Sequence, residues 1–165
     1  DHLGINRGSL YDTFGGKDEL FKRALLLYKR TFGRKIQEAM EAGHGPLDRL
    51  RSIFLEAARW AAEDRERKGC FIVNTTSEIA CLGEDYEKLL TDNYREYRAF
   101  FAGLLREAVD RGELAAGTDV EAHADYLFTV YNGLRVLSRL DRNPATLEGI
   151  VGVALQALPE IKNKK

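Results

Sequence analysis

The chain is poor in the residues from which metal and catalytic sites are most often built. It has two cysteines and three histidines among 165 residues, and they are scattered along the sequence. Neither Cys-x-x-Cys nor His-Glu-x-x-His spacing occurs, and no glycine-rich loop of the phosphate-binding kind is present. We therefore expect no metal site, no cofactor and no enzymatic activity.

Long apolar runs are also missing. No stretch approaches the roughly 18 apolar residues of a membrane-spanning helix, and no secretory leader pattern appears, so we expect a cytoplasmic protein with no membrane partner. The formal net charge is −1, but residues 1–35 contain eight Lys and Arg against four acids, whereas acids are in excess over 36–165. A basic N-terminal segment followed by an acidic remainder is typical of a nucleic-acid-binding protein with a second domain. Solvated helix faces can produce the same distribution of charge.

Prolines are few, and paired strands are not evident. The sequence therefore predicts an all-α fold. Apolar residues at three- and four-residue steps predict helices over 17–42, 46–63, 85–110, 120–140 and 145–158, with a capping box from Thr118 to Glu121 and a helix start at Asn143-Pro144. Two β-branched pairs leave a strand possible over 70–81, but we favour a buried helix there.

The segment 4–21 has the residue pattern of a helix that reads DNA. Apolar residues recur at the spacing that buries one helix face (Ile5, Leu10 and Phe14), and Gly15-Gly16 ends the helix. The opposite side carries side chains suited to phosphates and base edges, namely Arg7, Ser9 and Tyr11. The alternative is a short amphipathic helix of a helical bundle with an incidental Tyr and Arg on its surface.

With this pattern, the segment resembles the DNA-binding end of the TetR family of bacterial transcriptional regulators. The matching residues are Gly4, Gly8, Leu10, Tyr11, Phe14, Lys17, Leu20 and Phe21. The resemblance implies groove and phosphate contacts for Asn6, Arg7, Ser9 and Tyr11, and a phosphate contact for Lys17 beside a helix N-terminus. Asp12 departs from the neutral or basic side chain that the family more often has, so the operator sequence stays open.

The resemblance also implies an organisation for the whole chain. Residues 1–35 would form a partial helix-turn-helix head and the start of a connecting helix, with the first helix and most of the second lying upstream. Residues 36–165 would form a ligand-binding and dimerisation domain. The implied function is that of a homodimeric regulator, usually a repressor, which a small apolar or electrophilic effector releases from double-stranded operator DNA. The alternative is a helical ligand-binding or protein-interaction module that does not bind DNA.

Members of this family dimerise through their last two main helices, and the corresponding segments here are apolar around much of their circumference. We therefore expect a dimer interface that includes Val130, Gly133, Leu137, Val151, Ala154 and Leu158. Gly133 and Gly152 would let two backbones approach closely, unless both are ordinary tolerated breaks.

The middle helices contain more aromatic residues than a small core requires. Because the family places ligands between these helices, the resemblance implies a lining of Trp60, Asn74, Tyr97, Phe101 and Tyr131. We add Cys70, since cationic neighbours and an expected helix start favour its thiolate, which is the setting of an electrophile sensor. A buried, inert thiol is the alternative reading of Cys70.

Overall fold

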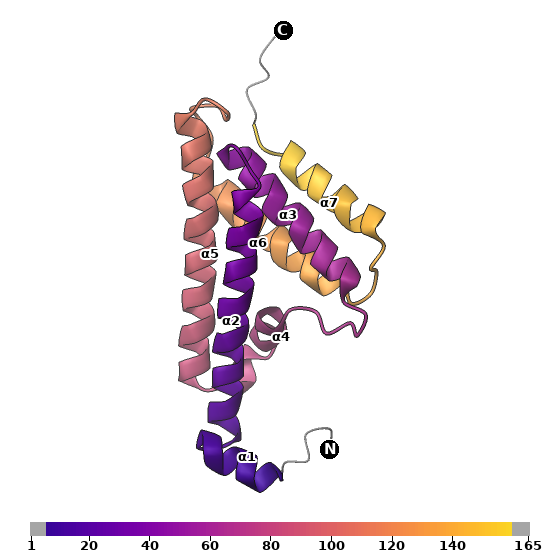
Figure 1. The fold of residues 1–165 in the computed structure, drawn as a ribbon. Coiled ribbons are helices and arrows are strands. Elements are labelled where there is room, and N and C mark those ends of the chain that lie inside the picture. Colours follow the sequence, from indigo (N-terminus) through magenta and orange to yellow (C-terminus); the bar gives the residue numbers. More distant parts are fainter. Residues whose placement is uncertain (1–5, 160–165) are drawn as a thin grey trace. The chain divides into compact units, whose positions relative to one another are not determined.

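The computed structural model describes residues 6–159, which form seven α-helices and one short 3₁₀-helix (Figure 1). In chain order these are α1 Arg7–Phe14, α2 Lys17–Glu41, α3 Pro46–Glu63, α4 Phe71–Ser77, η1 Ile79–Cys81, α5 Glu84–Asp110, α6 Val120–Leu137 and α7 Pro144–Gln156. These residues contain no β-strand, so the predicted all-α class is confirmed. Within the same range, no helix has the length and apolar character needed to cross a bilayer.

The chain divides into two compact units, Asp1–Lys35 and Ile36–Lys165, and α2 runs across the border between them. In the second unit, α3 packs against α5, α6 and α7, and α5 packs against α6. Figure 1 shows α3 and α7 side by side. The shared core contains fully buried side chains from all four helices, including Phe54, Phe101, Leu127 and Leu147. Burial of each such side chain stabilises the fold by about 1.5–3 kcal/mol relative to exposure.

Several helix ends lie where the sequence predicts them. Asn143 is the N-cap of α7 and accepts a hydrogen bond from the Ala145 amide at 3.0 Å, while Pro144 occupies the first helical position. This arrangement suits proline because the first amide of a helix has no partner within the helix. At the other end of the chain, Gly15 ends α1 with a φ of 81°, in the left-handed region that favours glycine.

The start and end of α6 differ from the prediction. The N-cap is Asp119, whose carboxylate accepts from the Ala122 amide at 3.0 Å. Thr118 instead donates its hydroxyl to the Ala115 carbonyl at 2.6 Å, so the predicted capping box is wrong. The helix also ends at Leu137 rather than near 140, and turns follow in which the Arg139 amide donates to the Val136 carbonyl and the Leu140 amide to the Leu137 carbonyl.

The segment 70–81 is helical, as we favoured, but it is interrupted and is not a buried helix, because Thr75 is the one buried residue of α4 and η1 has none. Three hydroxyls bond back to carbonyls four residues earlier, including Thr75 to Phe71 at 2.8 Å and Thr76 to Ile72 at 2.9 Å. Such bonds satisfy the hydroxyls within the helix, although they slightly destabilise and often bend it. The α-helix then ends before Glu78, and η1 follows. A continuous helix from Cys70 to Cys81 is therefore wrong.

Candidate functional site

The predicted DNA-contacting residues begin at the N-cap of α1. Asn6 is exposed, and its Oδ1 accepts a hydrogen bond from the Gly8 amide at 2.8 Å. The carbonyl end of this side chain is therefore used to start the helix, as expected of an N-cap asparagine. The Arg7 side chain, like residues 1–5, lies outside what the structure describes.

The remaining predicted contacts are spread over α1 and the first turn of α2. Ser9 and Lys17 are exposed, whereas Tyr11 is half-buried. Phe14 is half-buried on the apolar side, with the Arg23 guanidinium 5.8 Å from the centre of its ring. Lys17 is the first residue of α2, where backbone amides without helical partners attract anions.

In the second unit, α3, α5 and α6 bring five aromatic rings into one cluster. We call this set, Phe54, Tyr97, Phe101, Phe128 and Tyr131, the aromatic cluster. Tyr131 is at its centre, with ring centroids 5.8 Å from Phe54, 5.9 Å from Tyr97 and 6.0 Å from Phe101. Phe54, Phe101 and Tyr131 are buried, whereas Tyr97 and Phe128 are half-buried. Three of the predicted lining residues therefore lie together.

A buried arginine, which the sequence analysis missed, lies against this cluster. Arg135 is 7% exposed, and its Nη2 donates to the Tyr131 hydroxyl at 2.8 Å. Its guanidinium lies 4.9 Å from the Tyr131 ring centre and 6.0 Å from that of Trp60, so it joins Trp60 to the same site. The spacing of four residues between Tyr131 and Arg135 was the available signal, because such residues meet on one helix face.

The surroundings of the two phenols of the site raise the pKa of both hydroxyls. Burial raises the pKa of Tyr97, and the neighbouring Tyr131 adds to that rise. Burial also raises the pKa of Tyr131, although the adjacent Arg135 acts in the opposite direction. Cys70 is close enough to influence both phenols. At neutral pH, both hydroxyls are therefore able to donate hydrogen bonds.

Cys70 is the N-cap of α4, and Asn74 is in the middle of that helix. Cys70 influences the two phenols of the cluster, whereas the side chain of Asn74 bonds elsewhere. Cys70 is 7% exposed and immediately precedes α4, whereas Cys81 is exposed. Asn74 is held elsewhere, since its Nδ2 donates to the Lys68 carbonyl at 2.7 Å and its Oδ1 accepts from Arg139 at 3.5 Å. We infer that Asn74 positions the loop before α4.

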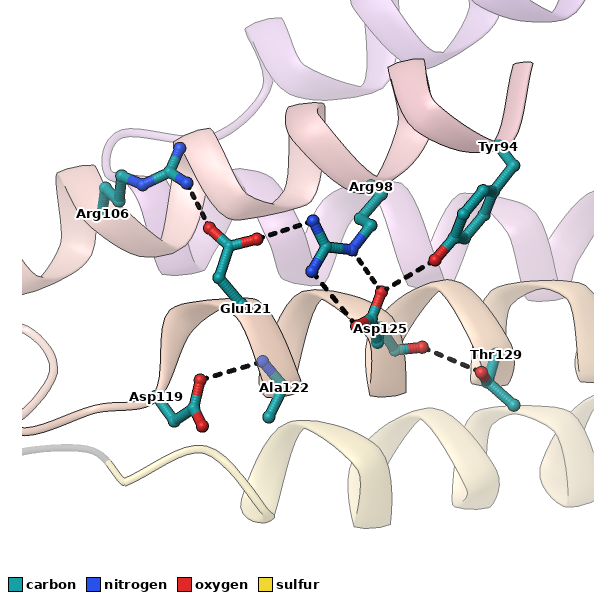
Figure 2. Close-up of polar contacts among 8 residues, drawn as sticks. All are labelled: Tyr94, Arg98, Arg106, Asp119, Glu121, Ala122, Asp125 and Thr129. Carbon is teal, nitrogen blue, oxygen red and sulfur yellow. Dashed lines mark hydrogen bonds and ion pairs between the residues drawn. The ribbon is translucent and has the colours of Figure 1, made fainter. Parts of the chain in front are cut away.

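Figure 2 shows an ion-pair network that joins α5 to α6. Arg98 donates through Nε to Asp125 at 2.5 Å and pairs with Glu121 at 2.7 Å. Arg106 also pairs with Glu121, and the Tyr94 hydroxyl donates to Asp125 at 3.2 Å. The hydrogen bond and charge of Arg98 lower the pKa of Asp125. The network thus adds polar contacts to the packing of the two helices.

The residues predicted for a dimer interface fall into two groups. Gly133 is exposed, and Val130 and Leu137 are half-buried. The other three, Val151, Ala154 and Leu158, are at most 4% exposed because they fill the core of their own chain. That these three take part in an interface stays a prediction. Apolar side chains that do face outward on and just after these helices include Val136 (51% exposed), Leu140 (78%) and Val153 (67%).

Comparison with known proteins adds a family and several relatives. A family model described as "Tetracyclin repressor-like, C-terminal domain" matches residues 46–152. The uncharacterised HTH-type transcriptional regulator YezE of Bacillus subtilis is 34% identical over 95% of this chain and 81% of its own length. The transcriptional regulator AcuR of Cereibacter sphaeroides is 28% identical over 87% of this chain and 66% of its own.

Solved structures give the same picture. The TetR family transcriptional regulator CifR, in complex with 26-bp double-strand operator DNA, superposes with a TM-score of 0.76 at 29% identity and covers 93% of this chain and 80% of its own. The regulatory protein TetR from Rhodobacter sphaeroides gives a TM-score of 0.83 at 26% identity, with 93% and 82% of the two chains covered.

Proposed function

Because this chain belongs to the TetR family of transcriptional regulators, we propose that it binds double-stranded operator DNA as a homodimer and represses transcription until an effector binds. The family match over 46–152, together with the α1 pattern, carries the proposal. Residues 1–35 belong to the DNA-binding head and 36–165 to the sensing and dimerisation domain. No catalytic step is involved, and the site of action is the cytoplasm, where the operator is.

On this proposal, α1 enters the major groove and Lys17 contacts a phosphate. Ser9 and Tyr11 supply hydroxyls to the backbone or to base edges, and Arg7 supplies a guanidinium to a base. Asn6 acts mainly by fixing the first turn of α1, since its carbonyl oxygen is already used there. Two such helices related by a two-fold axis would read half-sites about 34–36 Å apart.

Salt dependence of DNA binding tests this role. After a footprint has located an operator, Lys17→Met is expected to weaken binding on every sequence and to reduce the slope of log affinity against log salt by about 0.9, because one phosphate contact is lost. Lys88→Met is the matched control, since Lys88 is an exposed lysine of the second unit that pairs with Asp92. Equal slopes for the two variants would contradict the Lys17 contact, and absent or salt-insensitive binding would favour a helical module that does not bind DNA.

A second copy of the chain would cover the outward apolar side chains of α6 and α7. Exposed Val153 and Gly133 are the residues on which we base this interface, because exposed apolar patches mark association sites and glycine allows close backbone approach. Val153→Glu is expected to produce monomers in analytical ultracentrifugation. Leu55→Glu, at a similarly apolar exposed position of α3, is the control and should remain dimeric. Dimers in both variants would contradict this face.

The effector would bind beside the aromatic cluster, near Trp60 and Cys70. An electrophile is one candidate class, and it requires the buried Cys70 thiol to become accessible. The mechanism we propose is a population shift between two arrangements of the heads. A ligand that binds both arrangements equally would shift nothing. Structures of the full protein with and without effector test it, because identical head separations would exclude this mechanism.

A further inference from the structure

A pocket with three arginines lies between the segment that follows α3 and the turn that joins α6 to α7. Figure 1 shows these two segments close together at one end of the second unit. The pocket has a volume of about 1060 Å³, which is near the upper limit for a drug-sized ligand. Its lining residues are Ala62, Glu63, Arg65, Arg67, Leu140, Asp141, Arg142 and Asn143. None of them belongs to the aromatic cluster, so the pocket is a separate candidate site.

Asp64 holds two of these arginines beside the pocket. Its carbonyl oxygen accepts from the Arg67 amide at 3.1 Å and from Arg142 Nη1 at 3.3 Å. Its carboxylate accepts from the Gly69 amide at 2.6 Å, which fixes the other end of the same loop. Arg67 has a φ of 54° and is the one non-glycine residue of the described chain in the left-handed region. Residues in such conformations gather at segments that clamp ligands.

The guanidiniums outnumber the free acids of the pocket. Arg65 and Arg67 are exposed, and no acid within residues 6–159 pairs with either of them. Of the two acids in the lining, Glu63 pairs with Arg59, which lies outside the pocket, at 3.7 Å. Asp141 accepts from a backbone amide two residues further on at 2.8 Å. Because Arg59 offsets Glu63, three positive charges face one negative charge, and the excess is two.

We propose that this pocket binds a small phosphate ester, whose phosphate group pairs with Arg65, Arg67 and Arg142. A phosphate monoester carries about 1.5–2 negative charges at pH 7, which matches the excess of two positive charges. Guanidiniums pair with phosphate oxygens through two parallel hydrogen bonds, and Arg142 keeps four N–H donors beyond the one used on Asp64. The organic part of the ester lies against exposed Leu140.

A long polyanion such as a nucleic acid fits this site less well than a single phosphate group. Glu63 and Asp141 line the pocket, and Glu66 is exposed on the loop that carries Arg65 and Arg67. These acids repel any phosphate that lies beyond the reach of the three guanidiniums. The site therefore favours a compact ligand with one phosphate group.

Isothermal titration calorimetry of the unaltered protein tests the preference for phosphate. The probes are phenyl phosphate, phenyl sulfate and inorganic phosphate, titrated near neutral pH at constant ionic strength. The two phenyl esters have nearly the same shape, but the sulfate ester carries only one negative charge. We expect phenyl phosphate to bind with a Kd below about 1 mM and at least about tenfold more tightly than phenyl sulfate. Inorganic phosphate should bind more weakly than phenyl phosphate, because it lacks the apolar part.

Variants locate the binding. Arg65→Gln and Arg67→Gln each remove an exposed guanidinium that has no acid partner among the described residues, so both variants should fold. Each should weaken the binding of phenyl phosphate by about tenfold, because a charge-assisted contact is lost. Arg95→Gln is the matched control, since Arg95 is an exposed arginine of α5 outside the pocket. Its affinity for phenyl phosphate should equal that of the unaltered protein.

Equal binding of the two phenyl esters would overturn the proposal, as would absence of binding at about 10 mM phenyl phosphate. An undiminished affinity in both Arg65→Gln and Arg67→Gln, or an equal loss in Arg95→Gln, would overturn it as well. Inorganic phosphate that binds as tightly as phenyl phosphate would overturn the assignment of an organic phosphate. No DNA enters this assay, so this inference and the proposed function stand or fall separately.

Discussion

Two glycines with the same backbone conformation but different surroundings allow the energetic cost of close packing in the loop before α4 to be measured. Gly69 has a φ of 67° and Gly112 a φ of 68°, both in the left-handed region. A Cβ added at Gly69 would lie 3.0 Å from Arg139 Cδ and 3.3 Å from the Arg135 carbonyl oxygen. A Cβ at Gly112 would meet nothing within 4 Å. Alanine at the two sites therefore differs in packing and not in backbone strain.

The expected magnitudes follow from this difference. A non-glycine residue in the left-handed region costs about 1–2 kcal/mol, and the smaller freedom of the unfolded alanine chain returns about 0.4–1 kcal/mol. Gly112→Ala should therefore lower the free energy of unfolding by about 1 kcal/mol. Gly69→Ala adds overpacking, which begins at about 1 kcal/mol. The Arg139 side chain is exposed and can move away, but the Arg135 carbonyl belongs to a helix, so we expect about 2 kcal/mol in total.

Urea unfolding followed by Trp60 fluorescence measures both variants. Protein concentration must be equal in all samples, because dimer formation shifts apparent stability. With a slope of about 2 kcal/mol per molar urea, the two midpoints should differ by about 0.5 M, with Gly69→Ala the lower. Equal midpoints, or a lower midpoint for Gly112→Ala, would refute the close approach of this loop to the end of α6.

Three further predictions concern single side chains. Because Arg98 lowers the pKa of Asp125, this carboxylate stabilises the fold at neutral pH, and the stabilisation is lost as the pH falls through the lowered pKa. Asp125→Asn should therefore lower the urea midpoint at pH 7. The difference from the unaltered protein should shrink below about pH 3.9, the ordinary pKa of an aspartate. A maleimide should label exposed Cys81 at least about tenfold faster than buried Cys70 in the native protein and at similar rates in urea, and fast native labelling of Cys70 would contradict its burial. Asn143→Ala should cost about 1 kcal/mol in thermal unfolding and Asn143→Asp much less, since only alanine removes the cap; equal losses would speak against it.

Helix positions were largely predictable because their signals are local. Pro46 and Asn143-Pro144 mark helix starts by chemistry that involves neighbouring residues only. The predicted capping box was wrong because a local pattern cannot choose between two neighbouring N-cap candidates. Thr118 and Asp119 are adjacent, and either could be the N-cap. The Thr118 hydroxyl donates to the Ala115 carbonyl, which leaves Asp119 as the N-cap. The capping-box pattern does not include residue 115.

The composition of the site was predictable only in part, because burial depends on contacts between distant segments. Tyr97 and Tyr131 could be named from aromatic content. An arginine is usually exposed, and the four-residue spacing to Tyr131 predicts a contact of Arg135 with that ring but not its burial. The outward side of α7 was not predictable for a related reason. That helix is apolar on several sides, and periodicity cannot distinguish the side that covers α3, where Val151 lies, from the side that faces outward with Val153.

The residues of the aromatic cluster differ in how well their positions should tolerate substitution. Phe54 and Phe101 are fully enclosed, so a substitution there disturbs the mutual packing of three helices. Tyr97 and Phe128 are only half enclosed, and a different side chain at either position alters the local contour at a smaller energetic penalty. Divergence between sister regulators toward new inducers should therefore accumulate at these two marginal positions while the enclosed pair persists, which an ancestral reconstruction could trace.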